Sequence, residues 1–304
     1  MQRIAIFVTE RLADEARKIL SDYDVFELEA DDGALARCEV LMTRPSRARK
    51  ETLSKLTKLR MVQTMSAGVD SLDFTLLADG VIVCSNAGAY TGPVAEHAWG
   101  VLLGLAKGLH ARKQQVVPRT LRGRTLLVLG CGAIGSEVAR LSKSLGMKTI
   151  GVSRSFPNPE LFDEKHGLAE LGSVIGLADA VVISLPLTGA TRGVISYDIL
   201  SRAKEHVCMV NVGRGELAGE ADLIRWLRER PESRYATDVF WKKRGKESFE
   251  STAWELPNFA GTLHISGLPL GEKLIGPIVA AAKNVSMYLQ TGEAHNRVDR
   301  SEYS

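Results

Sequence analysis

A glycine-rich turn near the middle of the chain restricts the possible folds more than any other feature of the sequence. The apolar run Leu126 to Leu129 has the composition of a buried strand and leads into Gly130-Cys131-Gly132-Ala133-Ile134-Gly135. Between a strand and a helix, the first glycine of this pattern permits a tight bend. The second lets the backbone approach a pyrophosphate, and the third lets the helix pack on the strand. The pattern predicts a dinucleotide site; a glycine turn without a ligand is the alternative.

The strand that follows predicts which dinucleotide is bound. It ends at Val152, and Ser153-Arg154-Ser155 come next, where NAD sites usually place a carboxylate for the ribose 2′-hydroxyl. A carboxylate would repel a 2′-phosphate, whereas serine and arginine donate hydrogen bonds to it. We therefore expect NADP to be preferred, with NAD as the alternative; a solvated Arg154 that binds no ligand is the other interpretation.

Short β-rich runs alternate with helical stretches along the chain. The expected strands are 4–8, 40–42, 60–64, 81–84, 125–130, 148–152, 180–185, 207–210 and 235–239; the expected helices include 13–20, 92–110, 136–145, 220–230 and 272–289. Such alternation is typical of βαβ units and parallel sheets. Two runs of it, separated by the long helix over 92–110, predict an α/β protein with two doubly wound parallel-sheet domains.

Composition argues against several other classes of protein. The chain has 304 residues, enough for two domains, and its net charge of +3 gives no reason to expect nucleic acid or a membrane surface as a partner. The four cysteines form no CxxC pair, so we expect neither a metal site nor a disulfide framework. No apolar stretch approaches about 20 residues, and the N-terminal apolar run is too short for a signal peptide. These features favour a cytoplasmic protein.

Further motifs follow one another between residues 66 and 267. They are Ser66-Ala67-Gly68-Val69-Asp70; Asn86-Ala87-Gly88 with Val94-Ala95-Glu96-His97; Leu185-Pro186-Leu187-Thr188 with Thr191-Arg192-Gly193; Asn211-Val212-Gly213-Arg214-Gly215; Asp238-Val239-Phe240; and Leu256-Pro257-Asn258 with His264-Ile265-Ser266-Gly267. In this order they resemble the motifs of the D-isomer-specific 2-hydroxyacid dehydrogenase family, which includes glyoxylate/hydroxypyruvate reductases. Each motif is modest alone, and together they are specific.

The resemblance implies a split architecture. A Rossmann cofactor domain over residues 98–270 would be inserted in a flavodoxin-like substrate domain made of residues 1–97 and 271–304. The family binds its substrate in the cleft between the domains and is usually a homodimer, with the long helix contributing to the interface.

The resemblance also implies roles for particular residues. Arg214 would bind the substrate carboxylate and polarise its C2 carbonyl, because a planar guanidinium can grip two oxygens at once. His264 would protonate the alkoxide that forms as hydride arrives, and the backbone N–H groups of Ala67 and Gly68 would hold the carboxylate. His97 is expected to be structural. The cofactor would be lined by Gly130, Cys131, Gly132, Ala133, Ile134, Ser153, Arg154, Ser155, Leu185, Pro186, Thr188, Thr191, Val212, Gly213, Asp238, His264 and Gly267.

The sequence departs from the family at one position that matters for the chemistry. The family usually has a glutamate five residues after the aspartate matched by Asp238, and this glutamate hydrogen-bonds the histidine. Here the position is Lys243. The segment before Trp254 is slightly long, so an inserted Glu247 or Glu250 would be able to serve instead. Both interpretations stay open at this point.

These observations favour an oxidoreductase that moves a hydride between a nicotinamide cofactor and C2 of a small 2-keto or D-2-hydroxy acid. The alternative is a cofactor-sensing binding module of the same fold with little turnover, which the absence of glutamate at position 243 would favour. A formate dehydrogenase-like activity also tolerates loss of that glutamate, because it needs no alkoxide protonation. The retained Arg214 and His264 argue for the first function.

Overall fold

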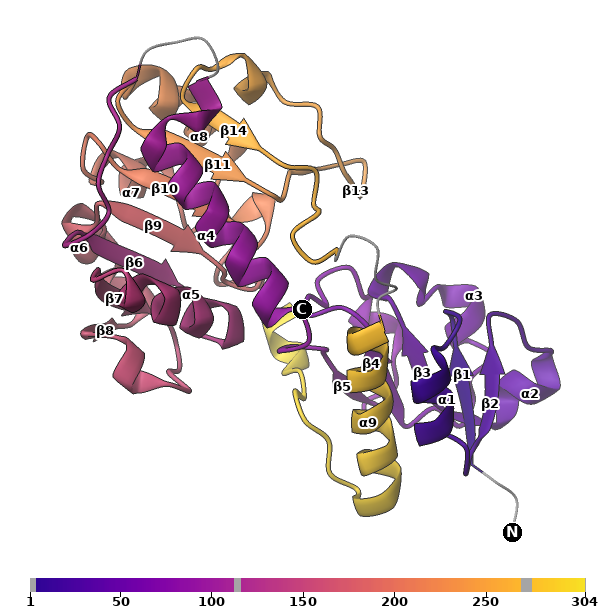
Figure 1. Ribbon diagram of the computed structural model, residues 1–304. Coiled ribbons are helices and arrows are strands. Elements are labelled where there is room, and N and C mark those ends of the chain that lie inside the picture. The colour runs from indigo at the N-terminus through magenta and orange to yellow at the C-terminus, as the bar shows by residue number, and fades with distance from the viewer. Residues whose placement is uncertain (1–3, 112–115, 269–274, 304) are drawn as a thin grey trace. The chain divides into compact units, whose positions relative to one another are not determined.

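The chain forms two compact units in the computed structural model, which describes residues 4–111, 116–268 and 275–303. Unit 1 comprises Met1–Tyr90 and Pro269–Ser304, and unit 2 comprises Thr91–Leu268 (Figure 1). The division expected from the sequence lay slightly further along the chain, inside the long helix α4 (Thr91–Lys107). The structure assigns the whole of α4 to unit 2, because this helix packs on other elements of that unit.

The central sheet of unit 2 is parallel and doubly wound. Its strands are β6 (Thr125–Leu129), β7 (Lys148–Val152), β8 (Glu164–His166), β9 (Ala180–Ile183), β10 (Cys208–Asn211), β11 (Arg234–Thr237) and β14 (Phe259–Gly261). Within the described residues their order is β14-β11-β10-β9-β6-β7-β8. The chain therefore reverses direction across the sheet between β6 and β9, where ligands of such sheets bind beyond the carboxyl ends of the strands.

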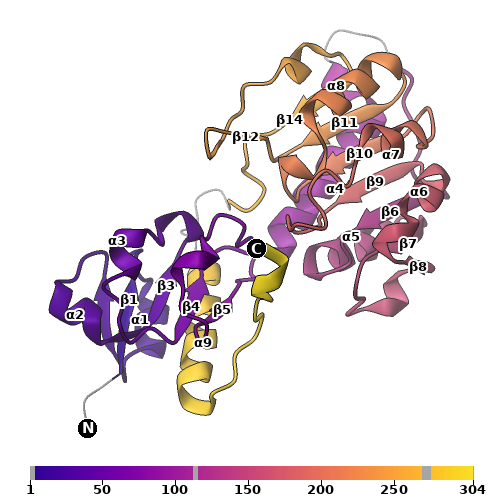
Figure 2. The same cartoon turned by 180° about the vertical axis from the view of Figure 1, so that it is seen from behind.

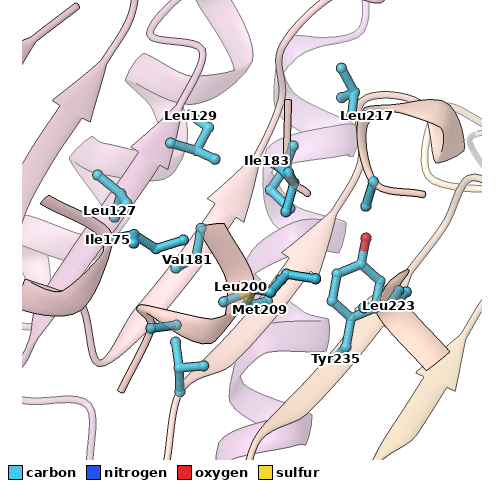
Figure 3. Close-up of a cluster of buried hydrophobic side chains, with 14 of the residues drawn as sticks. Leu127, Leu129, Ile175, Val181, Ile183, Leu200, Met209, Leu217, Leu223 and Tyr235 are labelled. Carbon is cyan, nitrogen blue, oxygen red and sulfur yellow. The ribbon is translucent and has the colours of Figure 1, made fainter. Parts of the chain in front are cut away.

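Helices cover both faces of this sheet. The helices α4 and α5 (Ala133–Ser144) lie on one face, and α6 (Leu171–Val174), α7 (Tyr197–Ser201) and α8 (Glu220–Glu229) lie on the other, as Figures 1 and 2 show from opposite sides. Aliphatic side chains of the strands meet Leu200 and Leu223 in a buried core on the second face (Figure 3). Burial of this apolar surface drives the folding of the unit.

Unit 1 has the flavodoxin-like strand order β2-β1-β3-β4-β5. The strands are β1 (Ala5–Val8), β2 (Asp24–Glu27), β3 (Cys38–Thr43), β4 (Met61–Thr64) and β5 (Ile82–Cys84), and each described pair is parallel. The short helices α1 (Asp14–Ile19), α2 (Asp32–Arg37) and α3 (Lys50–Leu53) connect them, and α9 (Ile275–Thr291) returns from the C-terminal segment. Residues 272–274 of the expected last helix lie outside the described residues.

The α/β class and the two parallel sheets expected from the sequence are confirmed. Short elements with little apolar periodicity were missed, including β2, β8, β14 and the small antiparallel hairpin of β12 (Lys242–Lys243) and β13 (Lys246–Glu247). None of the described helices is long and apolar enough to cross a bilayer.

Candidate active site

The glycine turn lies at the carboxyl end of β6, as its motif requires. Gly130 has a φ of 93°, a conformation that favours glycine. A Cβ on Gly135 would lie 1.9 Å from the Gly130 carbonyl oxygen, so the start of α5 can pack here only with glycine. At Gly132, by contrast, nothing lies within 4 Å of a Cβ position. The turn therefore offers an open backbone surface at the N-terminus of a 12-residue helix, which fits a pyrophosphate.

Three strand ends meet beside this turn. The main chain of Leu185 lies between two glycines: its nitrogen would be 2.8 Å from a Cβ on Gly130, and its oxygen 2.7 Å from a Cβ on Gly213. The Thr191 hydroxyl donates to the Pro186 carbonyl at 2.6 Å and accepts from the Thr188 N–H at 2.8 Å. Thr188 and Thr191 thus shape the loop after β9, and their hydroxyls are engaged within it.

The residues expected at the ribose follow β7 directly. Gly130 N–H donates to the Val152 carbonyl at 2.9 Å, so the end of β7 is fixed to the glycine turn. Ser153 is half-buried, while Arg154 and Ser155 are exposed. No carboxylate occupies these three positions, which hold two serines and an arginine.

Arg214 lies in a turn that the chain cannot easily deform. Asn211 is fully buried, and its side chain accepts from Gly213 N–H at 3.0 Å and donates to the Arg214 carbonyl at 2.8 Å. A Cβ on Gly215 would lie 2.4 Å from the carbonyl carbon of Phe240. The arginine turn is therefore packed directly on the segment that follows Asp238.

His264 is held close to Glu247 in the same unit. Its Nδ1 lies 2.6 Å from Oε2 of Glu247, whose other oxygen accepts from Phe240 N–H at 2.7 Å. An ionised carboxylate can only accept, so Nδ1 carries a proton and the opposite ring nitrogen, Nε2, is the atom left for a substrate. The interpretation that the histidine has no carboxylate partner is therefore wrong. The distance confirms the other interpretation, in which Glu247 lies beside the histidine.

A hairpin brings Glu247 to this place. Lys242 pairs with Glu247 and Lys243 pairs with Lys246, around a two-residue loop. The loop residues Arg244 and Gly245 have φ of 52° and 78°, as in a type I′ turn. Lys242 and Glu247 are paired and therefore share one face of the hairpin. Lys243 follows Lys242 in its strand, so its side chain points to the opposite face, away from Glu247. Its ammonium group donates instead to the Glu250 carbonyl, and the carboxylate of Glu250 is not the partner of the histidine.

Asp238 does not have the surroundings expected of a ligand-facing carboxylate. It is 1% exposed; Oδ1 accepts from the Thr262 hydroxyl at 2.6 Å and Ile265 N–H at 2.9 Å, and Oδ2 accepts from Ser266 N–H at 2.9 Å. Burial raises the pKa of Asp238, but hydrogen bonds from Ser266 and Thr262 outweigh it, so the pKa lies below its ordinary value. Asp238 is thus an ionised anchor for the loop that carries His264 and ends at Gly267.

Ala67 and Gly68 belong to unit 1, in the loop after β4. The Ser66 hydroxyl donates to the Gly68 carbonyl at 2.8 Å, and the Thr64 hydroxyl donates to the Ser66 carbonyl at 2.7 Å. Two short side chains thus fix the backbone of this loop. The structure brings the other expected site residues together at the strand ends of unit 2. Sequence reasoning missed Thr262, which no motif singles out.

Comparisons with known proteins agree with this geometry. A family profile described as "D-isomer specific 2-hydroxyacid dehydrogenase, NAD binding domain" matches residues 84–266. The chain is 29% identical to a glyoxylate reductase of Aeropyrum pernix, over 99% of this chain and 97% of that protein. It is 28% identical to a D-3-phosphoglycerate dehydrogenase of Methanocaldococcus jannaschii, over 91% of this chain and 56% of that protein. A solved structure described as a candidate formate dehydrogenase from Pyrobaculum aerophilum is similar, with a TM-score of 0.87 and 28% identity, over 99% of this chain and 100% of that one.

Proposed function

Because the chain belongs to the D-isomer specific 2-hydroxyacid dehydrogenase family, we propose that it transfers a hydride between a nicotinamide dinucleotide and C2 of a small 2-keto or D-2-hydroxy acid. The contact between His264 and Glu247 carries this proposal. It supplies the acid/base pair that reduction of a carbonyl needs, at a position where the sequence alone left its presence open.

In this proposal each residue acts on a different part of the substrate. The guanidinium of Arg214 binds the carboxylate and draws electron density from the C2 carbonyl. His264 donates the proton on Nε2 to the developing alkoxide. Glu247 keeps Nδ1 protonated throughout, so it orients the ring and stabilises the imidazolium from which the proton leaves.

The bound dinucleotide would supply the hydride, and the open backbone at Gly132 fits its pyrophosphate. Cys131, Ala133 and Ile134 complete the turn around it. Leu185, Pro186, Thr188, Thr191, Val212, Gly213 and Gly267 shape the rest of the cofactor site. We extend the proposal to a preference for NADP, with NAD as the alternative, because Ser153, Arg154 and Ser155 offer hydrogen-bond donors and no negative charge at the end of β7.

This preference predicts a measurable difference between the two reduced cofactors. One charge-assisted hydrogen bond to the 2′-phosphate contributes about 1.5–3 kcal/mol, which corresponds to a roughly tenfold or greater preference. We expect kcat/KM for NADPH to exceed that for NADH by at least this factor, in assays of absorbance at the nicotinamide band with glyoxylate, hydroxypyruvate and longer 2-keto acids. Arg154→Gln should reduce the ratio. Equal values for the two cofactors would contradict the preference.

Two other functions are less well supported by the geometry. A binding module with little turnover has no need for a histidine paired with a carboxylate, whereas in this chain a hairpin supplies the carboxylate of such a pair. Oxidation of formate requires no alkoxide protonation and therefore does not use the pair either. Absence of turnover with every 2-keto acid in the same assay would favour the binding module over the reductase.

We also propose a homodimer in the cytosol. The resemblance to the family supports the dimer, and the four cysteines support a reducing compartment, because all four are buried and unpaired. Burial raises the pKa of the Cys131 thiol, beside the glycine turn, to about 12, so this thiol stays protonated and unreactive. Analytical ultracentrifugation of the purified chain tests the dimer.

A further inference from the structure

The backbone of His264 is held in an unfavourable conformation. Its φ is 54°, in the left-handed region, which costs a residue with a Cβ roughly 1–3 kcal/mol unless its surroundings enforce it. The restraint comes from the neighbouring β11 segment. His264 N–H donates to the Asp238 carbonyl at 2.8 Å, and Thr262 N–H donates to the Thr237 carbonyl at 2.9 Å. The direction in which the imidazole points therefore depends on how firmly residues 262–266 are fixed.

The carboxylate of Asp238 fixes this loop at both ends. It accepts from the hydroxyl of Thr262, before the histidine, and from the N–H groups of Ile265 and Ser266, after it. Loss of the first contact would leave the loop before His264 held by backbone hydrogen bonds only, without a side-chain contact to Asp238. The Thr262 hydroxyl therefore contributes to the rigidity of the approach to His264.

A third side chain completes this arrangement from helix α4. His97 Nε2 lies 2.9 Å from the Thr262 hydroxyl oxygen and 3.8 Å from Oδ1 of Asp238. The Thr262 hydroxyl hydrogen is directed to Asp238, so the oxygen is an acceptor toward His97, and Nε2 of His97 must carry a proton. The hydrogen bonds run in one direction, from His97 to Thr262 to Asp238. They connect a 17-residue helix to the loop of the catalytic histidine.

We propose that His97 is a positioning residue for the reaction, acting through Thr262 and Asp238 to hold the left-handed loop that presents His264. This inference rests on the proposed role of His264 as proton donor. His97 touches neither substrate nor cofactor in this account. Its contribution is to fix the orientation of the loop, and a displacement of about 1 Å in a reacting group can slow a reaction by up to about a hundredfold.

The test compares pairs of matched variants in the full chain. Thr262→Val keeps the shape of the side chain but loses the hydroxyl, whereas Thr262→Ser keeps the hydroxyl. Likewise, His97→Leu loses the donor, and His97→Gln offers an amide N–H near the position of Nε2. We expect Thr262→Val and His97→Leu each to lower kcat for 2-keto acid reduction by about tenfold, with KM changed less than about threefold. Thr262→Ser and His97→Gln should keep most of the wild-type rate.

A second readout does not depend on turnover. The imidazole nitrogen resonances of His264 are assigned by their loss in His264→Gln, and their shifts report which ring nitrogen is protonated. We expect His97→Leu and Thr262→Val to broaden these resonances and weaken the Nδ1–H signal, while Ser and Gln restore it. If the wild-type chain reduces no 2-keto acid, the proposed function fails, and the spectra still decide the positioning role.

Where the Thr262→Val and His97→Leu variants fold, two outcomes would overturn the inference. One is a wild-type His264 spectrum and unchanged kcat in both Thr262→Val and His97→Leu. The other is a loss of rate that is equally large in Thr262→Ser and His97→Gln and that follows only the fall in melting temperature of each variant. That result would mean that His97 stabilises the fold and does not position His264. If the Val and Leu variants do not fold, a wild-type kcat and wild-type His264 resonances in Thr262→Ser support the inference, whereas a loss of either overturns it.

Discussion

At the scale of single residues, the acid/base pair depends on which side chain reaches Nδ1 of His264. Glu247 does so at 2.6 Å, and Lys243 is directed to the carbonyl of Glu250 on the other face of the hairpin. An amide in place of the carboxylate would still be able to accept a hydrogen bond but would no longer favour the imidazolium. The charge of Glu247, and not merely its shape, therefore matters for proton donation.

This difference leads to opposite expectations for two substitutions. Glu247→Gln should lower kcat/KM for reduction by more than about tenfold, because an amide gives the imidazolium no charged partner during proton donation. Lys243→Glu should be nearly silent, since that side chain points away. Steady-state kcat/KM of both variants, measured beside the wild-type chain with the same 2-keto acid, tests this difference. A loss of activity in Lys243→Glu, with none in Glu247→Gln, would contradict the assignment.

The same residues show what a sequence can and cannot predict. Gly130, Arg214 and His264 lie at strand ends, and their neighbours in sequence are also their neighbours in space, so motifs located them. Glu247 was only one of two open interpretations, because nothing local in Lys242 to Lys246 indicates which face of a hairpin meets the histidine. Thr262 and His97 were beyond prediction as partners, since 165 residues separate them and neither type of side chain is distinctive alone.

At the scale of elements, the β12–β13 hairpin is too short to be stable without its surroundings. It is anchored at its start by Trp241, whose indole N–H donates to the Ala218 carbonyl at 2.7 Å, and by Glu216, whose carboxylate accepts from Lys242 N–H at 3.3 Å. The ring of Phe249, after the hairpin, packs against Phe240 at 5.4 Å. The anchors on both sides fix the register that points Glu247 at the histidine.

We therefore expect Trp241→Phe to affect catalysis as well as stability. It removes a buried N–H and leaves the Ala218 carbonyl without its partner, which costs about 1–3 kcal/mol. Trp226→Phe is a matched control, because Trp226 is also buried and its indole N–H has no hydrogen-bond partner among the described residues. Thermal unfolding and kcat are measured for both variants. Only Trp241→Phe should lower kcat, by several-fold; equal effects on kcat would show that the anchor is unimportant for the site.

At the scale of the whole molecule, the two units are expected to respond differently to acid. Several carboxyls with lowered pKa values lie in unit 2. Burial alone would raise the pKa of Asp163, Asp179 and Asp238. Each carboxylate also accepts hydrogen bonds that outweigh this effect: Asp163 from Lys143, Asp179 from Lys204, and Asp238 from Ser266 and Thr262. The pKa of each therefore lies below its ordinary value. Such a carboxyl stabilises the folded state above its unfolded pKa, near 4, and this contribution is lost as the pH falls through the folded pKa.

The tryptophans make this expectation easy to test. All four, Trp99, Trp226, Trp241 and Trp254, belong to unit 2, so their fluorescence reports the unfolding of that unit alone. The melting temperature seen by fluorescence should change little between about pH 7 and 5 and fall steeply below about pH 4. Asp179→Asn, which removes one of these carboxylates, should flatten the decline. A melting temperature that stays constant down to about pH 3 would contradict the assignment.

The hairpin has a consequence for how the family's chemistry is inherited. In an alignment, the column that normally holds the glutamate contains Lys243, and comparison column by column would score the acid/base pair as lost. Here the carboxylate comes instead from Glu247, and the pairing of the hairpin strands directs it to His264. Deleting Gly245 would shift the pairing by one residue and turn Glu247 to the other face, while leaving every functional side chain in the sequence. In this chain, the position of the catalytic carboxylate therefore depends on the length of the hairpin loop as well as on the identity of the residue.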